Sequence, residues 1–257
     1  MDPGDDIEVS EDGLLGGRVR LLQPRTGYRA AVDPVLLAAA ARPEPGTRVL
    51  DLGCGTGAAA LCLAARCGEV RVLGVEMQAD YAALARRSAA LSGLAERLTV
   101  VEGDARDLRA LPSDWRPFDW AIANPPYFLC GNPAADAGRA QAHHGGAADL
   151  GEWVAAAAKA LRPRGGLALV HQAERLDDAL AALAAAGFGA VEVIPLWPKA
   201  GRVAKRVLVR GEKGRKTRMT LLPGLVLHRE DGNFTETARR ILFEAESLDA
   251  ALKEGGC

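Results

Sequence analysis

From residue 47 onward, short apolar runs alternate with helical stretches, and this alternation decides which folds the chain can adopt. The apolar runs have strand length and lie at 47–53, 70–76, 97–103, 118–124 and 165–172. The helical stretches lie at 58–66, 79–94, 150–161 and 173–187, and runs 190–197 and 202–211 look like a closing strand pair. Repeated strand–helix units predict an α/β fold with helices on both faces of a mostly parallel sheet. Strands buried on both faces also explain why these runs are continuously apolar.

Length and composition bound the rest of the interpretation. The 257 residues fit one large domain, and the formal net charge is only −1. We expect an acidic, disordered tail over 1–13, a single folded domain that carries the active site over 14–245, and a C-terminal tail over 246–257. The five cysteines form no C-x-x-C pair, so neither a zinc site nor a disulfide framework is indicated. The acidic start is unlike a secretory signal, and no run of 18 apolar residues occurs, so we expect a cytoplasmic protein without a membrane span.

A glycine-rich loop follows the first strand, in the sequence VLDLGCGTGAAAL. Gly53, Gly55 and Gly57 permit unusual backbone angles and a close approach of a ligand. The pattern also fits G-x-G-x-x-A, which is found in dinucleotide sites. Asp51 favours a different ligand, because a carboxylate beside the loop would repel a pyrophosphate at the helix N-terminus. Acidic residues also end the next two strands, Glu76 and Asp104, and this set suits a cationic nucleoside such as S-adenosylmethionine.

The tetrapeptide Asn124, Pro125, Pro126 and Tyr127 ends the fourth strand. Two consecutive prolines make a rigid loop that offers carbonyl acceptors and no N–H donors. The Asn124 side-chain oxygen and the Pro125 carbonyl can together accept both hydrogens of a planar amine. Tyr127, with Phe128, offers a face on which a flat ring can stack. The arrangement predicts a pocket for a planar nitrogen.

DLGCGTG, GVE, EGDARD and NPPY, in this order and spacing, resemble the class I S-adenosylmethionine-dependent methyltransferases that act on planar nitrogens. Segments 14–38 and 216–242 are similar, more narrowly, to bacterial tRNA (adenine-N6)-methyltransferases, which modify an adenine beside the anticodon of a valine tRNA. This resemblance implies a Rossmann-like, doubly wound sheet of seven mostly parallel strands with an antiparallel last strand. It also implies roles at the site: Glu76 holds the cofactor ribose, Asp104 and the Ala105 backbone hold its adenine, and residues 124–127 hold the target.

A basic run provides the candidate contacts to RNA. Residues 202–218 carry eight bases and one acid, whereas residues 1–12 carry six acids and no base. Within the run we expect Arg206, Lys213, Arg215 and Lys216 to bind tRNA phosphates, from a strand end and a loop near the carboxyl edge of the sheet. A solvated basic face without a partner is the alternative interpretation.

Four other functions remain as alternatives at this stage. A protein glutamine amide also fits an NPPY pocket, although only about 45 residues precede the glycine loop, whereas the glutamine enzymes carry a separate helical N-terminal domain. Another planar nitrogen of rRNA is a further substrate for the same chemistry. A nicotinamide-dependent oxidoreductase is disfavoured by Asp51 and NPPY, and a catalytically silent RNA-binding protein is disfavoured by the intact motifs. No metal and no protein partner are indicated.

Overall fold

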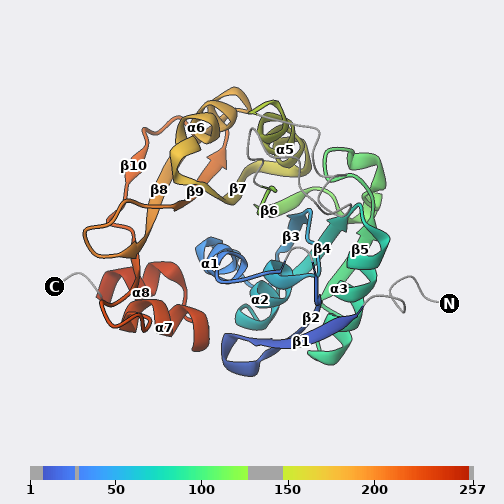
Figure 1. The fold of residues 1–257 in the computed structure, drawn as a ribbon. Helices are drawn as coiled ribbons and strands as arrows, with labels where there is room; N and C mark the ends of the chain where they lie inside the picture. Colours follow the sequence, from blue (N-terminus) through green and yellow to red (C-terminus); the bar gives the residue numbers. More distant parts are fainter. Residues whose placement is uncertain (1–7, 27–28, 127–146, 255–257) are drawn as a thin grey trace.

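The computed structural model describes residues 8–26, 29–126 and 147–254. Its centre is a sheet with the strand order β10-β8-β9-β7-β6-β3-β4-β5 (Figure 1). Strand β11 also pairs with β8. The strands of this sheet are β3 (Arg48–Leu52), β4 (Arg71–Glu76), β5 (Leu98–Glu102), β6 (Phe118–Ala123), β7 (Leu161–Gln172), β8 (Phe188–Lys199), β9 (Arg206–Lys213), β10 (Thr220–Leu221) and β11 (Leu225–His228).

The predicted topology is confirmed, with two short strands added. Strands β3 to β7 pair in parallel, and β9 is antiparallel to both of its neighbours, β7 and β8. These five strands together with β8 and β9 are the seven that we predicted, and β9 is the antiparallel last strand. The two-residue β10 and the four-residue β11 extend the sheet beyond β8 and were not predicted.

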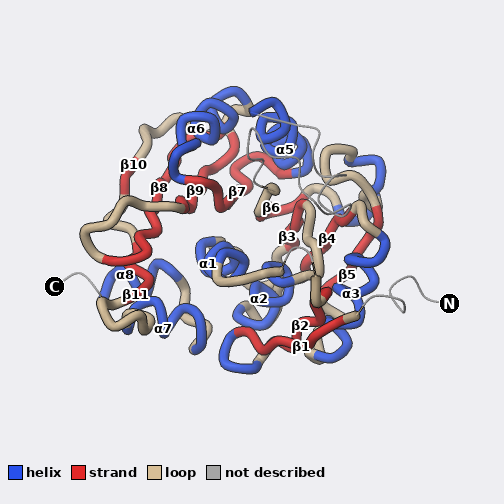
Figure 2. The backbone as a smooth tube through the Cα atoms, in the orientation of Figure 1, coloured by secondary structure: helices blue, strands red, loops and turns tan. Residues whose placement is uncertain are grey.

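Two hydrophobic cores lie on opposite faces of the sheet. Successive strand residues alternate between them, so Val49 belongs to one core and Leu50 to the other. Figure 2 shows α5 and α6 beyond one face and α1 and α2 beyond the other. The helices are α1 (Asp33–Ala40), α2 (Ala58–Arg66), α3 (Ala79–Leu91), α5 (Ala147–Ala160), α6 (Leu176–Ala185), α7 (Glu236–Phe243) and α8 (Leu248–Glu254). The doubly wound arrangement therefore follows from the sequence pattern.

The N-terminal segment differs from its prediction. Strand β1 (Val9–Leu14) pairs antiparallel with β2 (Val19–Pro24), so disorder over 1–13 is wrong for residues 9–13. Two acids of β1 form ion pairs with bases of the following segment. Glu11 pairs with Arg20 at 2.6 Å, and Asp12 pairs with Arg29 at 2.7 Å. The hairpin packs on α3, where the Ser88 hydroxyl accepts a hydrogen bond from the Leu22 amide.

The C-terminal segment is also folded. Residues 248–254, which we placed in a tail, form α8, and Leu248 and Ala251 are fully buried. Phe234 is partly buried and packs against the core just before α7, where its ring stacks on His228 and meets Phe243 edge-on. In the described part of the chain, no helix is both long enough and apolar enough to cross a membrane.

Candidate active site

The predicted site residues meet at one edge of the sheet because four parallel strands end there in register. Leu52 of β3 lies opposite Val75 of β4 on one side and opposite Ala123 of β6 on the other. Glu76 lies opposite Glu102, the last residue of β5. The glycine loop, Glu76, Asp104 and Asn124 therefore all follow or end strands at this carboxyl edge. Ligands of open α/β sheets bind at such an edge, where the strand order reverses, here between β3 and β6.

All three loop glycines adopt left-handed backbone angles, with φ of +62° at Gly53, +55° at Gly55 and +89° at Gly57. The space around them differs. A Cβ on Gly53 would lie 2.3 Å from Cη2 of Trp153 on α5, whereas a Cβ on Gly55 would meet no protein atom within 4 Å. Gly57 precedes α2 and packs against Ala85 of α3. Gly53 and Gly57 thus hold the loop close to its neighbours, and Gly55 faces open space.

Two buried carboxyl groups flank the loop. Asp51 is 2% exposed, and its Oδ2 accepts a hydrogen bond from the Ala60 amide in the first turn of α2. Burial raises the pKa of Asp51 to about 8, and the neighbouring Glu76 charge adds to the rise. Glu76 accepts hydrogen bonds from the Gly55 and Gln78 amides, each at 2.9 Å, while burial raises its pKa. A cation placed here would favour the ionised form of both groups.

Asp104 follows β5 and is held by a salt bridge. Arg106 donates to both of its carboxylate oxygens, with Nη2 2.8 Å from Oδ2, and reaches Glu152 of α5 at 3.1 Å. The hydrogen bonds from Arg106 lower the pKa of Asp104, so it is an ionised acceptor at neutral pH. The adjacent Ala105 is buried. That these two residues hold the cofactor adenine stays a prediction.

The rigid loop after β6 is described as far as Pro126. Asn124 is half-buried, Pro125 is buried and Pro126 is exposed, directly beyond the strand that pairs with β3. Tyr127 and Phe128, the predicted stacking residues, lie outside the described residues. The loop therefore begins beside Gly53, as its position in the sequence predicts.

The structure does not bring the predicted RNA-binding residues together. Arg206 lies at the carboxyl edge opposite Gln172, but its half-buried guanidinium pairs with Asp33 at 3.2 Å. Because β9 is antiparallel, Lys213 lies at the other edge, where its Nζ donates to the Leu161 carbonyl. Arg215 and Lys216 follow it, so our placement of that loop at the carboxyl edge is wrong. Their contact with RNA stays a prediction.

Two residues at the site were not anticipated. Trp153 was assigned only to a helix, yet its ring packs against Gly53. The one signal in the sequence was a large aromatic side chain in an otherwise alanine-rich helix. Arg106 was overlooked although it stands two residues after Asp104, a spacing that suits a carboxylate accepting from both the backbone and the side chain.

The chemistry of the edge fits S-adenosylmethionine. The carboxyl groups at the ends of β3 and β4 are stabilised in their ionised form by a nearby ammonium or sulfonium, whereas they would repel a phosphate. The open space at Gly55 admits a ligand against the backbone. Among the described residues, no three His, Cys, Asp or Glu side chains gather as a metal site requires.

Known proteins are similar to this chain in sequence and fold. Residues 49–165 match the family described as a methyltransferase domain. A predicted O-methyltransferase from Agrobacterium tumefaciens is 28% identical in sequence; the alignment covers 81% of this chain and 94% of that one, with a TM-score of 0.67. A precorrin 8W decarboxylase from Methanobacterium thermoautotrophicum, 23% identical over 72% of this chain and 92% of that one (TM-score 0.52), shares the fold.

Curated relatives narrow the family. A tRNA1(Val) (adenine(37)-N6)-methyltransferase from Aeromonas hydrophila is 35% identical over 213 residues, which are 82% of this chain and 87% of that protein. The enzyme of the same name from Aeromonas salmonicida is 33% identical over 72% of this chain and 77% of its own length. Both matches, over 213 and 186 residues, are much longer than the methyltransferase domain match at 49–165. The chain therefore belongs to the family of S-adenosylmethionine-dependent tRNA1(Val) (adenine(37)-N6)-methyltransferases.

Proposed function

We propose that this protein transfers a methyl group from S-adenosylmethionine to the exocyclic N6 amine of adenine 37 in tRNA1(Val). The observation that carries the proposal is the meeting of the acidic glycine loop and the Asn124–Pro125 backbone at adjoining ends of β3 and β6. The names of the curated relatives supply the tRNA and the position. A tRNA substrate also implies action in the cytoplasm.

The residues at the end of β6 have the donor and acceptor chemistry that an adenine amine needs. An exocyclic amine carries two hydrogens, and the Asn124 side-chain oxygen and the Pro125 carbonyl accept one each. Both hydrogen bonds draw the nitrogen toward a tetrahedral geometry and free its lone pair. Proline fixes φ and lacks an N–H, so the loop presents its acceptors without rearrangement.

Positioning accounts for the rest of the reaction. S-adenosylmethionine supplies a methyl group bound to a positively charged sulfur. The amine lone pair attacks the methyl carbon from the side opposite the sulfur, and the sulfur leaves with the electrons of the broken bond. Glu76 holds the cofactor ribose, Asp51 ionises beside the cofactor's positive charge, and the left-handed glycine loop lets the cofactor approach the backbone. No strong base is required, because the methylated amine is acidic enough to release its extra proton to a nearby acceptor or to water.

The test is methyl transfer to RNA from a cell that lacks this protein. Total tRNA from such a strain is incubated with the protein and tritiated-methyl S-adenosylmethionine, and the nucleosides are then separated. We expect label in N6-methyladenosine, carried by tRNA1(Val). Label in rRNA or in protein glutamine would keep the chemistry and overturn the substrate. Cofactor binding without any transfer would favour a silent RNA-binding protein instead.

A further inference from the structure

We propose that the turn between β8 and β9, residues 200–205, binds the tRNA phosphates beside the target adenine. The turn reads Ala-Gly-Arg-Val-Ala-Lys and contains no acid. This inference rests on the proposed function, because it names the surface that holds that substrate. It replaces Lys213, Arg215 and Lys216 with Arg202 and Lys205 as the main cationic contacts.

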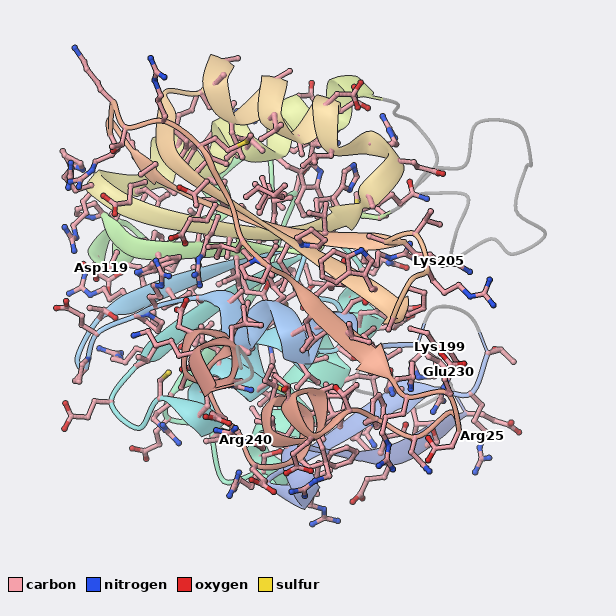
Figure 3. The ribbon with its side chains drawn as sticks, turned by 90° about the vertical axis from the view of Figure 1, so that its left-hand side faces the viewer. Arg25, Asp119, Lys199, Lys205, Glu230 and Arg240 are labelled. Atoms are coloured by element: carbon pink, nitrogen blue, oxygen red, sulfur yellow. The ribbon has the colours of Figure 1, made fainter. Side chains whose placement is uncertain are left out.

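The turn lies at the same edge of the sheet as Asn124. Ala123 of β6 is opposite Leu169 of β7, and three residues later Gln172 is opposite Arg206 of β9. Arg206 in turn lies opposite Leu196 of β8. Neighbouring strands are about 4.8 Å apart, so β9 lies about 10 Å and β8 about 15 Å from β6. Figure 3 shows Lys199 and Lys205 at one edge, with Asp119, near the start of β6, at the opposite edge.

The turn is anchored on both sides. The Lys205 carbonyl accepts a hydrogen bond from the Ala173 amide, just after β7, and the Arg202 amide donates to the Lys199 carbonyl. The Arg206 guanidinium ties the base of the turn to Asp33 at the start of α1. Arg206, which we expected to contact RNA, therefore positions the turn. A fixed turn loses little conformational entropy when RNA binds.

The charges of the turn are available to an anion. Arg202 and Lys205 are exposed, and neither forms an ion pair with any described residue. The neighbouring Lys199 is already engaged, since its Nζ donates to the Glu230 carbonyl and lies 3.9 Å from the Glu230 carboxylate. The exposed Glu174, next to Ala173, is the nearby acid on the other flank. Two uncompensated cations remain at the tip.

An apolar side chain also stands at the tip. Val203, between the two cations, is 82% exposed, more than any other large apolar side chain among the described residues. Cations flanking an apolar contact suit a nucleic acid strand, in which charged phosphates alternate with sugars and bases. Phosphate contacts position such a substrate without reading its sequence. Asn124 and Pro125, after β6, then hold the base, and the turn positions the RNA strand.

The experiment compares charge reversal at the turn with the same change elsewhere. The double variant Arg202→Glu/Lys205→Glu is assayed with a tRNA1(Val) transcript and S-adenosylmethionine. We expect the KM for tRNA to rise at least tenfold, while kcat stays within about twofold and S-adenosylhomocysteine binding is unchanged. The neutral variant Arg202→Ala/Lys205→Ala should bind tRNA with a weaker dependence on salt. The slope of the logarithm of the tRNA association constant against the logarithm of the salt concentration should become shallower by about 2, since each lost phosphate contact removes about 0.9.

The matched control is Arg116→Glu/Lys159→Glu. These exposed cations precede β6 and β7, at the opposite edge, and should leave every parameter unchanged. A turn variant with the unaltered KM and salt slope would overturn the inference. It would also be overturned if Lys216→Glu/Arg218→Glu raised the KM and the turn variant did not. Failure of the proposed function is distinct, because the unaltered protein itself would then transfer no methyl group to tRNA.

Discussion

Asp51 is a buried carboxyl group that the fold keeps mostly protonated at neutral pH. Its pKa is raised to about 8, mainly by burial, whereas an unfolded aspartate titrates near pH 4. Between these values the folded state holds a proton that the unfolded chain has released. Asp51 therefore lowers the stability of the free protein as pH rises from about 4 to about 8.

Cofactor binding should release this proton. At pH 7 the positively charged ammonium of S-adenosylhomocysteine favours the ionised carboxylate, so nearly one proton leaves Asp51 on binding. Titration calorimetry in two buffers of different ionisation enthalpy measures that number. We expect Asp51→Asn to lose most of the release and to bind more weakly. Equal proton release in both proteins would show that Asp51 does not face the cofactor's charge.

Substitutions at Gly53 and Gly55 should have different effects, because Gly53 packs against Trp153 and Gly55 faces open space. Alanine at either position adopts a left-handed backbone, which costs about 1–2 kcal/mol. Only Gly53→Ala also pushes a methyl group into Trp153, so we expect a further loss of about 1–3 kcal/mol in urea unfolding. Gly55→Ala should keep more stability but weaken cofactor binding, since its methyl group enters the open space. The reverse ranking of stabilities would contradict the described packing.

At the scale of elements, α8 is joined to the sheet by a buried ion network. Arg210 of β9, whose side chain is 3% exposed, pairs with Asp249 of α8 and with Glu192 of β8, each at 2.5 Å. Arg42 contacts the same two acids from the surface. Helix α8, which we predicted to be part of a tail, therefore supplies Asp249 as a partner for the buried Arg210. Arg210, although part of the basic run, is unavailable to RNA.

The two arginines of the network should differ greatly in their effect on stability. Arg210→Met removes the buried charge and leaves two half-buried acids with only Arg42 as a partner, so it should lower the free energy of unfolding by about 3 kcal/mol. Arg42→Met removes a half-exposed pair and should cost no more than about 1 kcal/mol. Chemical denaturation of both variants checks this. Equal losses would mean that the network is not buried in solution.

The same network predicts sensitivity to acid. Burial alone would raise the pKa of Asp249, but the hydrogen bonds from Arg42 and Arg210 outweigh it and lower the pKa. Its contribution is therefore complete above the unfolded value near 4 and is lost as pH falls below it. Thermal unfolding between pH 5 and 2 should show a smaller loss for Asp249→Asn than for the unaltered protein.

The elements that sequence analysis predicted are those whose pattern is local. The strands from β3 to β7 carry continuous apolar runs, and the glycine loop and NPPY each follow one directly. Strand β1 has no continuous apolar run. It pairs with β2, and its Glu11 forms an ion pair with Arg20, and neither contact is visible in a local pattern. The basic run misled for a similar reason: one charged segment spans a whole antiparallel strand and so reaches both edges of the sheet.

At the scale of the whole molecule, the two edges of the sheet carry different kinds of residues. The carboxyl edge gathers the acidic glycine loop, Glu76 and Asn124, with the cationic turn beyond β9. The other edge holds structural contacts such as Lys213 with Leu161. We therefore propose that the cofactor, the target base and the RNA backbone bind to successive parts of this one edge.

The most direct test is the Asn124→Ala variant, assayed for N6-methyladenosine in tRNA1(Val) beside the unaltered protein. Removing one acceptor of the amine should reduce kcat by a factor of about 10² to 10³ or more, because that hydrogen bond strengthens in the transition state. Binding of S-adenosylhomocysteine should remain nearly unchanged. Transfer at close to the original rate would contradict the assignment of the target amine to the end of β6.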